Sequence, residues 1–356
     1  MVEYRITAEE RARFKRCRRQ WDFFSSHRRN LRSNDTVEPA LPAALKDALA
    51  AYYYPGTWDW QHEVTQPLVH KALARSLDDA DATELLNQGL ALLDCYDAWA
   101  NAVDDFAPVK INLDVDALVP DPDDLERGLV VHDGSPVVYP CRIDLVAVDA
   151  VDDYWVVCHQ IVDEWQDVDR WDRDEQALAA CWAFEHDYIG VEIAGTIHNE
   201  IRIGGPLPFP PAGSALMRMP KAVAQHEASG GGRLLPQHQR VSAQASRGHA
   251  PDRIEQRTAG VLRRTRIRRS RHEITSVGAL IAAEAVDMAN WPTIYPTFAG
   301  HCRDCEFRAP CSALSAGLDA EPLLQADFRQ APDDAGKPRL GQSTWGFGRG
   351  AAPPSW

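Results

Sequence analysis

Apolar side chains at helical intervals mark the start of the chain. Thr7 and Glu10 stand three residues apart, the spacing of a capping box that satisfies free N–H groups at a helix start. Apolar residues follow at every third or fourth position, namely Phe14, Cys17, Trp21 and Phe24. This pattern predicts an amphipathic first helix over residues 8–30.

The middle of the chain changes from helical spacing to strand-like runs. Helical spacing continues over residues 40–54 and 64–104, and Pro108 ends it. Runs of Val, Ile and Leu bounded by Asp, Pro and Gly then predict strands. The expected segments are strands over 109–119, 137–148 and 154–162, a helix over 174–188 and a strand over 190–203. Their order predicts an α/β (α+β) fold with a mixed central sheet flanked by helices.

The last third of the chain divides by composition. Residues 204–251 are rich in Pro, Gly, Ser, Gln and His, which is typical of a low-complexity insertion or loop. A helical pattern resumes at Asp252 and runs to about Asp287. We therefore expect five parts: a helical part over 1–110, an α/β core over 111–203, the insertion over 204–251, a basic helix and cysteine segment over 252–318, and a polar tail over 319–356.

The overall charge restricts how the protein meets nucleic acid. The 356 residues carry a net charge of −14, and such an acidic body is repelled by the phosphate backbone at long range. A basic lane on that body is still compatible with DNA binding. No stretch reaches the roughly 18 uninterrupted apolar residues of a membrane span, and the N-terminus does not resemble a signal peptide, so we expect a cytoplasmic protein.

The cysteines are the strongest chemical signal. In a reducing compartment, clustered cysteines are more typical of metal ligands or catalytic thiols than of disulfides. Cys302, Cys305 and Cys311 have a C-x2-C-x5-C spacing that can surround a metal centre. Zinc sites usually take two neighbouring pairs, and no second pair exists, which makes Cys17 the natural fourth ligand. Zinc and unligated cysteines are the alternatives to an iron–sulfur cluster.

A lone N-terminal cysteine completing a C-terminal triplet resembles the iron–sulfur nucleases of the RecB superfamily, including the AddB-type helicase–nuclease subunit and the CRISPR adaptation exonucleases. The matching segments are FKRCRRQWDFF at residues 14–24 and HCRDCEFRAPC at residues 301–311. The resemblance implies a PD-(D/E)xK, restriction-endonuclease-like core. It also implies that a 4Fe–4S cluster on Cys17, Cys302, Cys305 and Cys311 staples the N- and C-terminal segments together.

The catalytic elements of that family are incomplete here. The family places an Asp at the end of one strand, D/E-x-K on the next and Q-x-x-x-Y on a helix, so that carboxylates hold Mg²⁺ or Mn²⁺ and lysine orients water. Asp144 matches the first position. Cys158 and Gln160 stand where the carboxylate and lysine belong, with His159 between them, and the helix keeps Gln176 but has Ala180 in place of tyrosine.

Two further segments bear on the site. The upstream helix, where many relatives have a metal-contacting histidine, reads LPAALKDALAAYY and has none. Residues 163–175 contain seven acidic side chains, and migration of Glu164 or Glu175 into the metal site is one way to repair it. A solvated acidic loop is the simpler interpretation of this segment.

Arginines supply a candidate DNA contact. Residues 253–271 contain eight of them, and a strip of arginines suits phosphate binding. The candidate DNA-binding residues are Arg263, Arg264, Arg266, Arg268 and Arg269. A solvated helix face is the alternative interpretation of this strip.

Three functions stay open at the sequence level. The first is an accessory protein that binds DNA, as single strands or duplex ends, and takes part in its processing, with weak or lost phosphodiesterase activity. A helicase or repair protein is the expected protein partner. The second is an active exonuclease that uses Mg²⁺ or Mn²⁺ through relocated ligands. The third is an iron–sulfur redox or protein-interaction module without nucleic acid.

Overall fold

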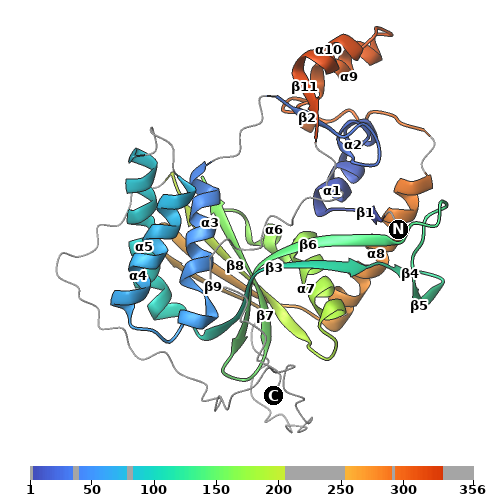
Figure 1. Cartoon of the computed structure of the whole chain (residues 1–356). Coiled ribbons are helices and arrows are strands. Elements are labelled where there is room, and N and C mark those ends of the chain that lie inside the picture. Colours follow the sequence, from blue (N-terminus) through green and yellow to red (C-terminus); the bar gives the residue numbers. More distant parts are fainter. Residues whose placement is uncertain (1–2, 35–39, 78–82, 205–252, 291–292, 332–356) are drawn as a thin grey trace, which may run out of the picture.

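A twisted mixed sheet of seven strands forms the centre of the molecule (Figure 1). The computed structural model describes residues 3–34, 40–77, 83–204, 253–290 and 293–331. The strands are β1 (Tyr4–Arg5), β3 (Phe106–Leu118), β6 (Val137–Asp149), β7 (Tyr154–Val162), β8 (Ile193–Arg202), β9 (Ile254–Ala259) and β10 (Leu262–Arg268). Their order is β1, β6, β7, β8, β10, β9, with β3 paired to β6. The pairs β1–β6 and β7–β8 are parallel and the others antiparallel, which confirms the predicted mixed sheet.

Helices cover both faces of this sheet (Figure 1). One layer contains α3 (Ala40–Tyr52), α4 (His62–Ser76) and α5 (Thr83–Val103), and the 3-10 turn η1 (Pro55–Thr57) lies between α3 and α4. The other contains α6 (Val168–Asp172), α7 (Glu175–Asp187) and α8 (Arg271–Asn290). Successive strand residues point to opposite faces, so Leu145 and Val157 pack in the first core while Val146 and Val156 pack in the second.

The first and last described segments form one small lobe, at the top of Figure 1. Its elements are α1 (Ala8–Arg16), α2 (Arg18–Phe24), β2 (Leu31–Ser33), η2 (Gly300–Cys302), α9 (Arg308–Ser315), α10 (Glu321–Asp327) and β11 (Phe328–Gln330). Strands β2 and β11 pair antiparallel, and Phe23, Phe307 and Phe328 share a separate apolar cluster. We call residues 8–33 and 293–331 the terminal lobe.

The helices of the first half differ in detail from the prediction. The expected helix over 8–30 is broken at Cys17, whose extended backbone (φ −162°, ψ 116°) separates α1 from α2. The expected helix over 64–104 is two helices, α4 and α5. The short hairpin of β4 (Pro120–Asp121) and β5 (Asp124–Gly128) follows β3.

The prediction for the last third was wrong in two places. Residues 254–268 form β9 and β10 rather than a helix, because β10 finds a hydrogen-bonding partner on both sides, β8 and β9. The helix starts only at Arg271. Residues 321–330 of the expected tail fold as α10 and β11, whereas residues 332–356 of that tail and residues 205–251 of the expected insertion lie outside the described residues. Within the described part of the chain, no helix is both long and apolar enough to cross a membrane.

Candidate functional site

Asp144 lies where β6 and β7 separate. The antiparallel pairing of these strands stops at Leu145 and Val157. Leu145 is the residue after Asp144, so Asp144 lies just outside the paired region. The next N–H donor on β7, that of His159, donates to Asp144 Oδ2 at 2.9 Å. The Asp144 carboxylate therefore takes the place of a main-chain acceptor at the point where the two strands diverge.

A lysine reaches the same carboxylate from the helical layer. Lys46 on α3 places Nζ 3.3 Å from Asp144 Oδ2, and the two side chains are 46% and 20% exposed. Lys46 lies in the segment where the family resemblance led us to look for a metal-binding histidine. The sequence gives no signal for it, because one lysine on an amphipathic helix is indistinguishable from a solvated residue.

The two positions on β7 carry no negative charge. Cys158 and Gln160 pair in register with His198 and Glu200 of the parallel strand β8. Burial raises the pKa of the Cys158 thiol well above its usual range, and the Asp144 carboxylate adds to the shift. Cys158 is therefore a neutral thiol at neutral pH, and Gln160 is a neutral amide.

The His159 side chain points into the core between the sheet and the α3–α5 layer. Its ring is 3% exposed, stacks on Tyr53 with centroids 5.5 Å apart, and places Nδ1 3.5 Å from Asn199 Nδ2. Burial lowers the pKa of His159 to about 4. The side chain is thus a neutral core histidine, and only its main-chain N–H takes part in the Asp144 site.

The start of α7 does not complete a metal site. Gln176 is exposed in the first turn, and its N–H donates to the N-cap residue Asp174. Glu175 forms an ion pair with Lys15 of α1. Among the described residues, no hydrogen bond or ion pair joins Gln176 or Glu164 to Asp144. The proposed migration of acidic ligands therefore has no contact that supports it.

A second buried histidine lies on the α7 side of the sheet. His198 is completely buried on β8 and stacks on Trp171, with centroids 4.8 Å apart. Its Nδ1 is 4.0 Å from Asp174 Oδ2. Burial lowers the pKa of His198 to about 3, so this ring is neutral too. The sequence hinted at it only as a polar stretch, His198 to Glu200, inside an apolar strand.

The five candidate DNA-binding arginines are engaged inside the protein. Arg263 pairs with Glu200 at 2.6 Å and Arg264 with Asp104 at 2.7 Å, all four side chains being 10% exposed or less. The remaining pairs are Arg266 with Asp149 and Asp105, Arg268 with Asp153, and Arg269 with Asp172. Only Arg268 of the five is exposed to a substantial degree. These arginines hold β10 to the surrounding acidic residues.

The four candidate cluster cysteines all lie in the terminal lobe. The Thr297 N–H donates to Cys17 Sγ at 3.4 Å, and Cys302 Sγ lies 3.8 Å from the Thr297 carbonyl oxygen. Burial raises the pKa of the Cys305 thiol, and the neighbouring Cys17 and Cys311 add to the shift. The thiols of α9, η2 and the α1–α2 junction therefore lie in one neighbourhood.

The side chains around these cysteines suit a thiolate–metal site, but the cysteines are farther apart than metal ligands. Arg19 Nη1 lies 3.5 Å from Cys311 Sγ, and N–H donors of this kind offset the charge of metal-bound sulfur. The donor set is sulfur alone, which suits an iron–sulfur cluster. Within the described residues, however, no three His, Cys, Asp or Glu side chains are grouped closely enough to hold a metal ion.

Comparison with known proteins adds little to this description. No family model and no curated protein matches the chain. A solved structure described as the crystal structure of SSO0001 is similar at 11% sequence identity, with a TM-score of 0.31, over 77% of this chain and 94% of that chain. This similarity is too low to assign a function.

Proposed function

We propose that the chain is a DNA-binding accessory protein with a PD-(D/E)xK-like core, that it has lost phosphodiesterase activity, and that a 4Fe–4S cluster ties its two ends together. One observation carries the loss of activity. The Lys46 ammonium lies 3.3 Å from Asp144 Oδ2, the carboxylate at the first expected metal position.

The charge at this position disfavours a divalent ion. Mg²⁺ is held by carboxylate and phosphate oxygens in an octahedral shell. Asp144 offers one carboxylate, one oxygen of which already accepts from His159 N–H and faces Lys46. A metal ion would have to displace an ammonium group that carries its own positive charge. Neither Cys158 nor Gln160 supplies a second anionic oxygen, and neither can replace the lysine that orients the attacking water.

The arrangement of the cysteines supports the cluster. Cys17 comes from one end of the chain and the other three cysteines from the opposite end, and they meet in one lobe. A bound cluster would supply four iron–sulfur bonds that cross-link these segments. Cys17, Cys302, Cys305 and Cys311 would hold it, with Arg19 and the Thr297 N–H donating to sulfur.

The distribution of charge supports DNA binding. The chain carries −14 overall, yet the terminal lobe, residues 8–33 and 293–331, contains twelve Arg and Lys against eight Asp and Glu. A positive lobe on an acidic body directs a polyanion to that lobe.

The test measures binding and cleavage on the same DNA. Labelled linear DNA, single-stranded and duplex, is incubated with protein purified without oxygen, with Mg²⁺ or Mn²⁺ added. We expect a salt-sensitive complex without shortened products. Cleavage that is lost in Asp144→Ala would instead establish an active nuclease, and the absence of any complex at low salt would favour the redox or interaction module.

A further inference from the structure

We propose that the surface around Tyr295 and Phe298 in the terminal lobe is a binding site for single-stranded DNA, with the two rings as stacking platforms. This inference rests on the proposed function and goes beyond it. It moves the DNA contact from the β10 arginines, which are engaged in ion pairs, to a different face of the protein.

Two aromatic residues with exposed side chains lie on the irregular segment that precedes η2. Phe298 is 72% exposed and Tyr295 is 46% exposed. Apolar rings in contact with water are unfavourable. Tyr295 and Phe298 are three positions apart, and together they offer an apolar surface that a ligand can cover. Nucleic-acid bases stack on rings of this kind irrespective of sequence.

Three contacts fix this segment on the lobe. The Arg19 N–H donates to the Tyr295 carbonyl at 3.2 Å, at the start of α2. Thr297 contacts Cys17 through its N–H and Cys302 through its carbonyl oxygen. The backbone between the two rings is therefore held against both halves of the lobe, and the rings are presented from a fixed position.

Arginines adjoin the two cysteines that contact Thr297, the residue before Phe298. Arg16 precedes Cys17, Arg303 follows Cys302, and both are exposed. Arg19 also reaches this region, where its guanidinium donates to the Cys311 carbonyl and to Ser315 Oγ. Cationic side chains interleaved with exposed rings are the combination that binds a single strand, because the guanidinium groups contact phosphates while the rings stack on bases.

The choice of a single strand follows from the rings. In a duplex the bases are already stacked and paired, and a protein ring can reach their faces only after unstacking. A purely apolar protein partner would cover Phe298 as well, but it would make no use of Arg16 and Arg303. The positive surplus of residues 8–33 therefore favours a polyanion with exposed bases.

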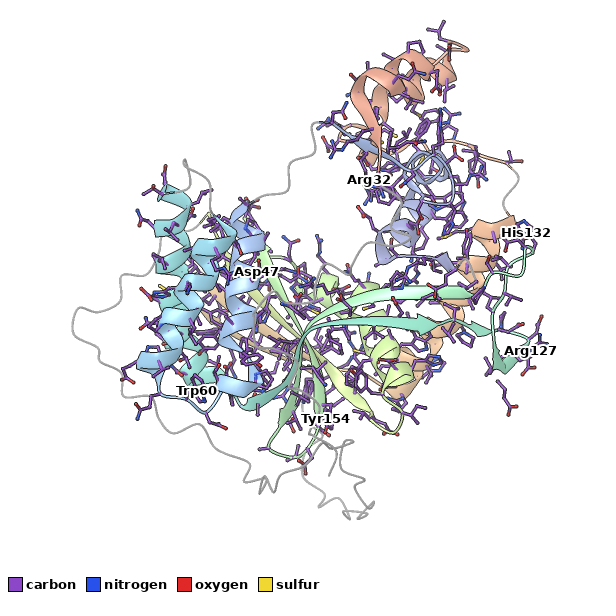
Figure 2. All side chains as sticks on the ribbon, viewed as in Figure 1. Arg32, Asp47, Trp60, Arg127, His132 and Tyr154 are labelled. Atoms are coloured by element: carbon purple, nitrogen blue, oxygen red, sulfur yellow. The ribbon has the colours of Figure 1, made fainter. Side chains whose placement is uncertain are left out.

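The experiment measures binding of a fluorescein-labelled thymidine oligonucleotide by anisotropy, using the full chain purified without oxygen. We expect Phe298→Ala and Tyr295→Ala each to weaken binding on the order of ten-fold, and Phe298→Trp to retain it. Trp60→Ala is the matched control, because Trp60 is 50% exposed but lies on the helical layer away from the lobe (Figure 2). It should leave affinity unchanged. Replacing Arg16 and Arg303 together should reduce the salt dependence.

The possible results distinguish failure of the Tyr295 and Phe298 site from failure of the proposed DNA-binding function. If the wild type binds but Phe298→Ala and Tyr295→Ala bind equally well, the site is wrong and the proposed function stands. If the wild type does not bind at low salt, both are overturned. If Phe298→Ala weakens binding of a blunt duplex as much as that of the single strand, stacking is not the basis of recognition. Because the Phe298 side chain is 72% exposed, an unchanged melting temperature is expected for Phe298→Ala.

Discussion

Arg264 and Asp104 form an ion pair in the protein interior, with Nη2 and Oδ1 2.7 Å apart and side chains only 5% and 2% exposed. Arg264 also donates to Asn199 Oδ1, and Asp104 accepts from Tyr53 Oη. The pair joins β10 to the end of α5 across 160 residues of sequence. An arginine of the strip over residues 253–271 thus stabilises the fold through an internal ion pair.

Breaking this pair should destabilise the protein strongly. Asp104→Asn keeps the shape of the side chain but leaves the Arg264 charge buried without a counter-ion, a change that typically costs about 3–5 kcal/mol. The free energy of unfolding is measured by urea titration. Asp153→Asn is the control, since its pair with Arg268 is 34–40% exposed and should contribute less than about 1 kcal/mol. Equal effects of the two substitutions would contradict the buried pair.

Acid should destabilise the fold through its buried histidines. The folded-state pKa of His159 is about 4, below the usual value of 6.5, so the unfolded chain binds more protons between these two values. The contribution of His159 to the free energy of unfolding is fully present above pH 6.5. It falls by about 3 kcal/mol as the pH drops toward 4. His159→Phe, which retains a ring beside Tyr53, should make the pH dependence shallower in urea titrations at several pH values.

An exposed histidine provides the control for this pH effect. His132 lies at the surface near the β4–β5 hairpin (Figure 2). His132→Phe should leave the pH dependence of unfolding unchanged. A wild-type unfolding free energy that is constant between pH 7 and 4 would contradict the lowered pKa.

Restoring the missing ligands should restore metal binding. Cys158→Asp with Gln160→Lys supplies a second carboxylate and the lysine of the family motif, and we expect Mn²⁺-dependent nicking of DNA to be created or increased. Adding Lys46→Gln removes the competing ammonium and should tighten Mn²⁺ binding on the order of ten-fold. Electron paramagnetic resonance of Mn²⁺ measures this, and Lys71→Gln on α4 is the control. A triple variant that binds no Mn²⁺ would count against the assumed register of Asp144 and Cys158.

The cysteines give a spectroscopic prediction. Protein purified without oxygen should be brown, absorb broadly near 400 nm and contain about four irons per chain. Cys17→Ser should lose the colour and make the terminal lobe sensitive to proteolysis, because its two halves are then no longer cross-linked. Cys95→Ser, on α5, should retain both properties. A colourless wild type containing zinc would refute the cluster.

Much of the central sheet could be predicted from local patterns. The segments 137–148, 154–162 and 174–188 agree with β6, β7 and α7 to within a residue. Alternating or continuous apolar runs report on burial, which is a local property of these segments. The same apolar runs placed Asp144 within the strand over 137–148, whereas the family pattern led us to expect it at a strand end; β6 continues to Asp149.

Local sequence patterns were sufficient for these elements, for the cysteine spacing and for the absence of a carboxylate at Cys158. They were not sufficient for residues 254–268, which are strands because they pair with β8 and with each other. The same holds for Lys46, which faces Asp144 from 98 residues away, and for the β10 arginines, which pair with acidic residues. Charge pairing depends on distances in space, which the spacing of residues along the chain does not contain.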